Sequence, residues 1–123
     1  MKKSKNVVTV LIAEPDATIL NGLKLLVETE DDLSVIGQAH TLNQMLEQTR
    51  KLHPDVILMD FINSDAKGLK TVTQIKNEFP GTKVIILTTY PTAVKEALRA
   101  GASHFFLKDC IPEELFAAIR ASI

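Results

Sequence analysis

Polar side chains follow four apolar runs of the chain, at the point where each run ends. Glu14, Asp60, Thr88 and Lys108 occupy these positions, and Asp16 lies two residues beyond the first of them. The runs themselves carry almost no charge, so these residues do not merely sample a polar surface. Two or three carboxylates attract a hard divalent cation such as Mg²⁺. A hydroxyl and an ammonium group complement a tetrahedral anion.

This set of groups suits phosphoryl transfer, which requires mainly positioning and neutralisation of the charge on the phosphoryl oxygens. A carboxylate can also act as the nucleophile and form an aspartyl phosphate. The hypothesis is that Asp60 is phosphorylated, with a metal on one side and Thr88 and Lys108 on the other. Each residue also has a simpler interpretation. Asp60 suits the start of a solvated loop, Asp16 a helix cap and Glu14 a solvated position. Thr88 suits an ordinary strand end, and Lys108 suits a surface lysine.

The apolar runs predict five buried strands. Short, nearly continuous apolar segments bounded by turn residues are typical of strands that are covered on both faces, as in a parallel sheet. The predicted strands are Val7–Ala13, Leu33–Gly37, Val56–Met59, Lys83–Leu87 and His104–Leu107.

Apolar residues at helical spacing predict a helix after each strand. Five alternations of strand and helix indicate right-handed βαβ units and a parallel sheet with helices on both faces. Ligands of such sheets bind at the carboxyl ends of the strands, where the polar residues gather. The predicted helices run from Ala17 to Thr29 with Asp16 as cap, from Leu42 after the cap Thr41, from Leu69 to Phe79 before Pro80-Gly81, from Val94 to near Gly101, and from Pro112 onward.

The composition limits the classes of function. The chain has 123 residues, which predicts one domain, and its net charge of −1 carries no electrostatic sign of nucleic-acid or anionic-membrane binding. A single cysteine, Cys110, excludes an internal disulfide and fits a reducing compartment. Since no apolar run approaches the length of about 20 residues that a membrane span needs, we expect a soluble, cytoplasmic protein.

Six short motifs extend over nearly the whole chain, from about Val7 to Ala121. They are the segments 10–14 (Val-Leu-Ile-Ala-Glu), 54–60 (Pro-Asp-Val-Ile-Leu-Met-Asp), 68–69 (Gly-Leu), 84–88 (Val-Ile-Ile-Leu-Thr), 100–103 (Ala-Gly-Ala-Ser) and 106–109 (Phe-Leu-Lys-Asp). Together they resemble the receiver domain of bacterial two-component response regulators, in detail the NarL/LuxR-type subgroup. The resemblance implies a flavodoxin- or CheY-like doubly wound (βα)5 fold of three layers, with the parallel sheet order 2-1-3-4-5.

The resemblance also implies roles for individual residues. Asp60 matches the phosphoacceptor, which receives its phosphoryl group from a phosphohistidine of a sensor histidine kinase. Thr88 matches the switch hydroxyl, and Lys108 matches the lysine that pairs with a phosphate oxygen. Phe105 falls at the position of the aromatic residue that rotates on activation.

The implied cofactor is Mg²⁺, and its ligands are the part of the motif that departs most from the family. Glu14, Asp60 and the backbone carbonyl of Ile62 match family positions, and Asp16 is a further candidate. The family usually has two adjacent acidic residues after the first strand, and the second binds the metal directly. Here Pro15 takes that second position and offers neither a carboxylate nor an N–H group. We therefore expect weak Mg²⁺ binding.

Three functions remain to be compared. The first is a receiver domain, not an enzyme beyond self-phosphorylation and autodephosphorylation, that switches conformation and dimerisation to control an output such as transcription. The second is an atypical receiver with impaired Mg²⁺ binding that acts as a phosphorylation-independent interaction module. The third, a small hydrolase or nucleotide-binding enzyme, lacks the required loops. We expect DNA contact only through a helix-turn-helix output domain that follows this chain, a phosphorylation-linked homodimer, and no membrane contact.

Overall fold

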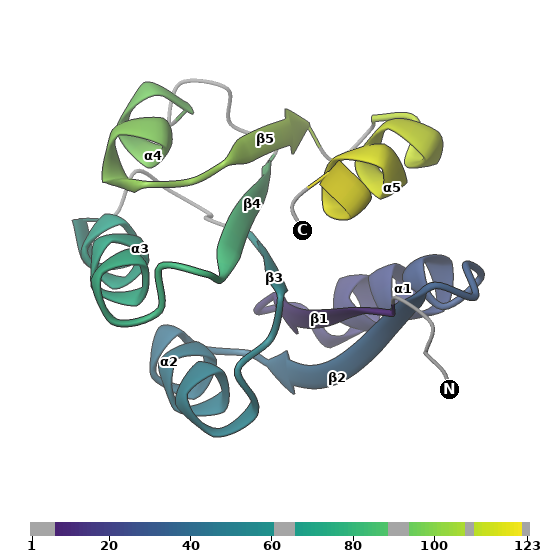
Figure 1. Cartoon of the computed structure of the whole chain (residues 1–123), viewed down its shortest axis with the longest axis horizontal. Coiled ribbons are helices and arrows are strands. Elements are labelled where there is room, and N and C mark those ends of the chain that lie inside the picture. The colour runs from purple at the N-terminus through teal and green to yellow at the C-terminus, as the bar shows by residue number, and fades with distance from the viewer. Residues whose placement is uncertain (1–6, 61–65, 89–93, 108–109, 122–123) are drawn as a thin grey trace, which may run out of the picture.

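The computed structural model describes residues 7–60, 66–88, 94–107 and 110–121, which form five strands and five helices in strict alternation (Figure 1). Within these ranges no helix has the length and apolar character that crossing a membrane requires. The elements are β1 (Val8–Ala13), α1 (Ala17–Val27), β2 (Leu33–Ala39), α2 (Leu42–Leu52), β3 (Val56–Met59), α3 (Ala66–Glu78), β4 (Lys83–Thr88), α4 (Val94–Ala100), β5 (His104–Leu107) and α5 (Pro112–Ala121).

The five strands form one parallel sheet in the order β2-β1-β3-β4-β5, which confirms the predicted topology. Helices α1 and α5 lie on one side of the sheet, and α2, α3 and α4 lie on the other (Figure 1). The strands are parallel because each helix returns the chain to the edge at which the next strand begins. All carboxyl ends of the strands therefore meet at one edge.

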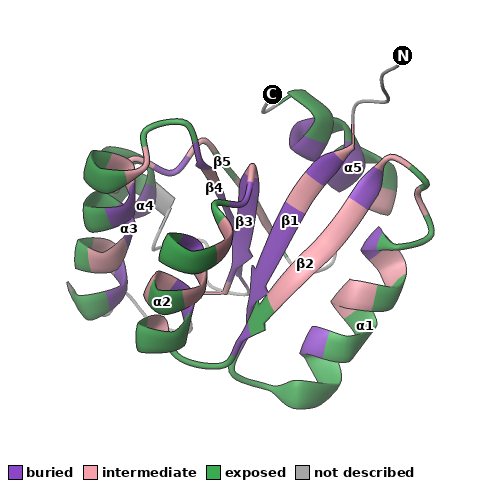
Figure 2. Ribbon diagram, turned by 60° about the horizontal axis from the view of Figure 1, so that its bottom comes forward, coloured by how far each residue is buried: buried purple, intermediate pink, exposed green. Residues whose placement is uncertain are grey.

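Two apolar cores fill the spaces between the three layers. Side chains of successive strand residues point to opposite faces, so Ile12 and Leu58 pack with α1 and α5, whereas Leu11 and Ile57 pack with the other three helices. The central strands β1 and β3 are buried along almost their whole length, and the edge strand β2 is only partly covered (Figure 2).

Strand β2 is longer than predicted, because it continues through Gly37 to Ala39. The glycine suggested the end of the strand, but it lies inside the sheet, where β2 pairs with β1 across a register shift. A Cβ atom at residue 37 would lie 2.7 Å from Leu52 Cδ1 and 2.9 Å from Leu11 Cδ1. The missing side chain therefore allows α2 and β1 to pack closely, and the strand does not end there.

Other boundaries also differ from the prediction. Helix α1 ends at Val27 rather than Thr29, and the Thr29 amide bonds the Leu26 carbonyl (3.2 Å) in a tighter turn. Helix α3 already begins at Ala66, and Thr88 is the last residue of β4 rather than the first of a turn.

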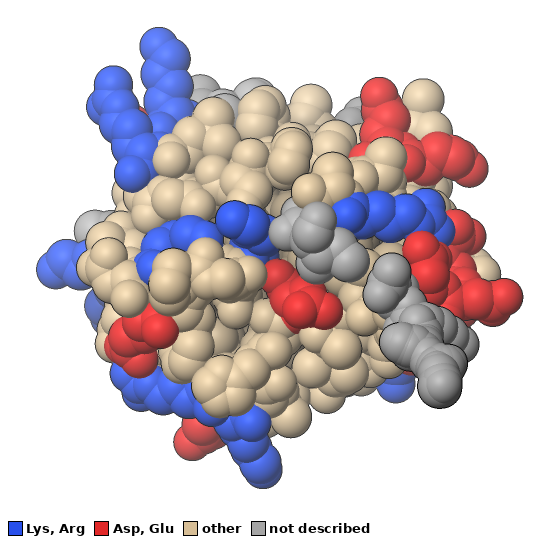
Figure 3. Space-filling view, viewed as in Figure 1, with Lys and Arg blue, Asp and Glu red and all other residues tan. Residues whose placement is uncertain are grey.

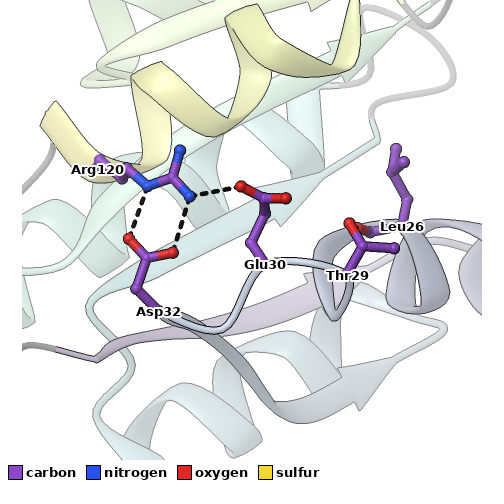
Figure 4. A network of polar contacts seen from close by, with 5 residues as sticks. All are labelled: Leu26, Thr29, Glu30, Asp32 and Arg120. Atoms are coloured by element: carbon purple, nitrogen blue, oxygen red, sulfur yellow. Dashed lines mark hydrogen bonds and ion pairs between the residues drawn. The ribbon is translucent and has the colours of Figure 1, made fainter.

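Charged side chains of both signs cover the face seen in Figure 3, with acidic groups mainly toward α1 and α5 and basic groups mainly toward α3 and α4. On the acidic side, Arg120 of α5 binds the turn between α1 and β2 (Figure 4). Its Nε and Nη2 atoms bond the two oxygens of Asp32 (2.7 and 2.8 Å), and Nη2 also bonds Glu30 (2.7 Å). The hydrogen bonds from the guanidinium lower the pKa of Asp32 below its ordinary value. This network attaches the last helix to the first half of the chain.

Candidate functional site

The register of the central strands brings two of the predicted site residues together. Ala13 at the end of β1 is paired with Met59 at the end of β3, so the residues that follow them, Glu14 and Asp60, lie beside each other at the carboxyl edge. The Asp60 amide donates to the Ala13 carbonyl (3.0 Å), which continues the parallel ladder by one bond. Two carboxylate-bearing residues therefore meet at the position that the sequence predicts.

The hydroxyl and the aromatic residue of the predicted site belong to the opposite face of the sheet. Thr88 continues the alternation of Ile86, which packs toward α2, α3 and α4, and it is fully buried. Phe105 is paired with Ile86 and packs against the same core. Thr88 and Phe105 thus lie on the same face of the sheet.

Glu14 is an unusually buried carboxylate, with 2% of its surface exposed. Burial of an ionised carboxylate is costly unless the group accepts hydrogen bonds. Here Oε2 accepts a bond from the Asp16 amide (3.0 Å). The Glu14 amide donates to the Ala39 carbonyl (2.9 Å), which fixes the backbone against β2. Glu14 is therefore held in place at the edge, and the interpretation of a solvated position is wrong.

Asp16 is the N-cap of α1, as the simpler of its two interpretations predicted. Its Oδ1 accepts bonds from the amides of Thr18 (2.9 Å) and Ile19 (3.0 Å), and its backbone is extended with φ −87° and ψ 119°. This geometry satisfies two of the helix amides that lack a partner within the helix. Its role as a metal ligand, the other interpretation, stays a prediction.

One residue at this edge was not assigned a role from sequence. The imidazole Nδ1 of His40 lies 3.3 Å from the Glu14 carbonyl oxygen, directly after the end of β2. The prediction that β2 ends at Gly37 placed His40 outside the edge. The alternation of apolar and other residues in β2 continues past Gly37. This pattern would have extended the predicted strand and placed His40 at the edge.

The remaining predicted residues lie outside the described residues. These are Lys108, the predicted phosphate-binding lysine, and Ile62, the predicted carbonyl ligand. Within the described residues, no group of three or more histidine, cysteine, aspartate or glutamate side chains is arranged to hold a metal ion. Among the residues described, the edge offers the pair of carboxylates Glu14 and Asp60.

A paired carboxylate edge and a buried threonine on a 2-1-3-4-5 sheet are matched by a known family. The family model of the response regulator receiver domain covers residues 10–120. The chain belongs to this family. Receiver domains are generally signalling modules rather than enzymes, and they generally bind Mg²⁺.

Relatives of this receiver domain include transcriptional regulatory proteins of Bacillus subtilis. The chain is 35% identical to the uncharacterized transcriptional regulatory protein YxjL over 121 residues, 97% of the chain and 56% of that protein. It is 38% identical to the transcriptional regulatory protein YdfI over 116 residues, 93% of the chain and 54% of that protein. The chain therefore spans about half the length of these relatives.

Solved structures show the same fold. The response regulator domain of Thermotoga maritima CheB is 28% identical, with a TM-score of 0.83, and the match covers 94% of this chain and 96% of that one. The receiver domain of the response regulator NarL from Mycobacterium tuberculosis has a TM-score of 0.85 at 24% identity, and the match covers 96% and 98% of the two chains. The latter supports the fold alone.

The donor set at the edge fits Mg²⁺ in part. This ion keeps several waters in proteins and is commonly held by one or two carboxylates together with phosphate oxygens. Glu14 and Asp60 provide two such carboxylates, and a carboxylate that accepts one hydrogen bond retains further acceptor positions. The Oδ1 atom of Asp16 is engaged by the amides of Thr18 and Ile19, so this atom serves the helix cap.

Proposed function

We propose that this receiver domain accepts a phosphoryl group on Asp60 from a phosphohistidine of a sensor histidine kinase. The observation that carries the proposal is the register of Asp60 with the buried Glu14 at the carboxyl edge of the sheet. In the transfer, the P–N bond of the phosphohistidine breaks and its electron pair stays on the imidazole nitrogen. A carboxylate oxygen of Asp60 forms the new P–O bond.

The neighbouring residues hold the transferred group and respond to it. The Lys108 ammonium pairs with a phosphoryl oxygen, and the Thr88 hydroxyl turns toward another. The position of Phe105 on the same face as Thr88 supports a coupled movement of the two side chains. The added charge then changes the packing around α4, β5 and α5, a local charge change with an effect at a distance.

Glu14, Asp60 and the backbone carbonyl of Ile62 are the proposed Mg²⁺ ligands. When bound, the ion supplies positive charge that neutralises the phosphoryl oxygens. The protein's own contribution is to hold Glu14 beside Asp60: the Asp16 amide donates to the Glu14 carboxylate, and the Glu14 amide donates to the Ala39 carbonyl of β2.

The output of the domain is proposed to be transcription in the cytoplasm. Supporting this proposal, the relatives YxjL and YdfI are named transcriptional regulatory proteins and are nearly twice as long as the matched region. A helix-turn-helix domain that contacts DNA, and a homodimer that forms on phosphorylation, complete the proposal. A receiver domain of Salmonella RcsB, 25% identical with a TM-score of 0.81, has been solved with the phosphomimetic BeF₃⁻.

Acetyl phosphate tests the proposal directly. Incubated with acetyl phosphate and saturating Mg²⁺, the protein gains the mass of one phosphoryl group in an intact-protein mass spectrum. Asp60→Asn shows no gain, whereas the control Asp55→Asn, at the other end of the same strand, is labelled like the wild type. A wild-type protein that stays unlabelled would refute the proposal.

One observation favours a second function, a receiver that works without phosphorylation. Pro15 stands between Glu14 and the cap Asp16 and adds no carboxylate to the edge. In this case the domain is a constitutive interaction module. Size-exclusion chromatography separates the two functions, because only the first predicts that acetyl phosphate changes the oligomeric state of the wild type and not that of Asp60→Asn.

A further inference from the structure

A histidine directly after β2 is connected to the acidic carboxyl edge. The imidazole Nδ1 of His40 lies 3.3 Å from the carbonyl oxygen of Glu14. A carbonyl oxygen only accepts hydrogen bonds, so Nδ1 carries a proton and donates it to this bond. The bond joins the segment after β2 to the segment after β1, across 26 positions of the chain.

This bond continues the pairing of β1 and β2 after both strands have ended. The Glu14 amide donates to the Ala39 carbonyl (2.9 Å). At Thr41 the chain turns into α2, of which this residue is the N-cap. The His40 ring therefore supplies, from a side chain, a donor for the next carbonyl of the β1 segment.

The backbone of His40 is itself held by the first turn of α2. Its amide donates to Gln44 Oε1 (2.7 Å), and the Gln44 amide donates to the Thr41 hydroxyl (3.1 Å). Such reciprocal bonds at the start of a helix fix the angle at which the chain enters it. The place of the imidazole is therefore set by α2.

The peptide group between Glu14 and Pro15 depends on this imidazole. Proline has no N–H, so the Glu14 carbonyl is the one hydrogen-bonding group of that peptide. The Glu14 side chain lies next to it, almost fully buried, and its Oε2 accepts a bond from the Asp16 amide (3.0 Å). Loss of the His40 bond therefore frees the peptide that joins Glu14 to the cap of α1.

We infer that His40 is a positioning residue of the phosphoacceptor edge: its imidazole fixes the Glu14–Pro15 peptide, and with it the place of the Glu14 carboxylate beside Asp60. This role rests on the proposed function of the same edge. A misplacement of about 1 Å near reacting groups can slow a reaction by as much as about a hundredfold. His40 acts through Glu14, because the strand order places β1 between β2 and the strand that Asp60 follows.

Two variants separate the hydrogen bond from the other properties of the side chain. His40→Leu removes the donor and keeps much of the volume. His40→Asn keeps a donor, because the amide nitrogen of asparagine lies as many bonds from Cβ as Nδ1 does. Since His40 is exposed, both variants are expected to fold and to unfold thermally close to the wild type.

Amide hydrogen exchange measured by NMR, without Mg²⁺ or a phosphodonor, tests the structural part of the inference. The Asp16 amide is expected to exchange about fivefold faster in His40→Leu, the factor that the net free energy of one hydrogen bond gives. In His40→Asn it exchanges at the wild-type rate. The Gln44 amide is the internal control, because its bond to Thr41 does not involve the ring. Equal exchange of the Asp16 amide in the wild type and His40→Leu would overturn the inference.

Labelling by acetyl phosphate at saturating Mg²⁺ tests the effect on the reaction. His40→Leu is expected to have a maximal rate about fivefold below that of the wild type. The acetyl phosphate concentration that gives half this rate is unchanged, because the ring acts through Glu14. His40→Asn restores the maximal rate. A change confined to the half-maximal concentration would indicate contact with the phosphodonor and overturn the positioning role, as would a His40→Asn variant as slow as His40→Leu.

The exchange and the labelling fail independently. A wild type that acetyl phosphate does not label refutes the phosphoacceptor function, while the exchange of the Asp16 amide still decides whether His40 holds the Glu14 segment. A labelled wild type with the same maximal rate as His40→Leu refutes only the role of His40.

Discussion

Two aspartates flank strand β3, Asp55 before it and Asp60 after it, and both are half-buried. Asp55 Oδ2 accepts bonds from the amide (2.9 Å) and the hydroxyl (3.0 Å) of Thr9, and the Asp55 amide donates back to the Thr9 hydroxyl (2.9 Å). Asp60 instead lies beside Glu14, with its backbone amide on the Ala13 carbonyl. The same residue type thus joins two strands at one edge and faces a second carboxylate at the other.

The comparison indicates that polar groups have different tasks at the two edges of this sheet. Those at the amino edge join neighbouring strands, and those at the carboxyl edge form the candidate functional site. At the amino edge, backbone amides at the start of β1 need acceptors, and the Asp55 carboxylate supplies one. The Thr82 hydroxyl similarly donates to the Pro54 carbonyl (2.9 Å). At the carboxyl edge, the chain turns away into helices, and polar side chains gather where the ligands of parallel sheets bind. Four predictions test this contrast.

The largest effect is expected from Asp60→Asn. The variant loses all labelling by acetyl phosphate, because the amide is not a nucleophile for phosphoryl transfer. Its midpoint of thermal unfolding stays close to that of the wild type, because asparagine has nearly the size and shape of aspartate and the backbone bond of residue 60 to the Ala13 carbonyl remains. Mass spectrometry and circular dichroism measure the two quantities, and labelling of the variant would contradict the assignment.

Asp55→Ala is expected to lower the stability of the protein and to leave the labelling of Asp60 intact. Removing the carboxylate leaves the Thr9 amide and hydroxyl without this acceptor, and an unsatisfied group of this kind costs about 1–3 kcal/mol. The free energy of unfolding in urea should fall by that amount, while labelling at Asp60 remains. If Asp55→Ala unfolds at the wild-type urea concentration, the two ends of β3 do not differ as described.

Asp16→Ala is expected to destabilise the protein by about 1 kcal/mol through loss of the α1 cap. Asp16→Asn should restore most of that stability, because its side-chain oxygen accepts the same bonds from the amides of Thr18 and Ile19. The difference between the free energies of unfolding of these two variants in urea measures the contribution of the helix cap, because both variants lack the charge. Equal losses in both variants would show that charge rather than capping is the source of the stability.

Arg120→Gln is expected to have the smallest effect, since the ion pairs with Asp32 and Glu30 are exposed to solvent. The guanidinium lowers the pKa of Asp32 below its ordinary value of 3.8. A lowered carboxyl pKa stabilises the folded state above the unfolded pKa, and this stabilisation is lost as pH falls through the folded pKa. The difference in thermal stability between wild type and variant should therefore be present at neutral pH and shrink below pH 3.8. A difference that is independent of pH would rule out the Asp32 pair as its source.

The sequence by itself determined the helices and strands, and the edge of the sheet at which the candidate site residues gather. Apolar runs and helical spacing are local signals of a few residues, and they predicted all five strands, all five helices and the cap at Asp16. The parallel topology followed from the alternation alone. It was enough to predict that the polar residues after the strands gather at one edge, whereas the strand order that makes Glu14 and Asp60 neighbours came from the resemblance to receiver domains. The functional roles of the site residues stay predictions.

Only the tertiary structure decided which partner each polar group has. Asp55 binds Thr9 from 46 residues away, and Arg120 binds Asp32 from 88 residues away. The extension of β2 past Gly37, and with it the place of His40 beside Glu14, depended on how closely α2 packs on the sheet. Such contacts depend on register and packing between distant segments, and no pattern within a few residues encodes them.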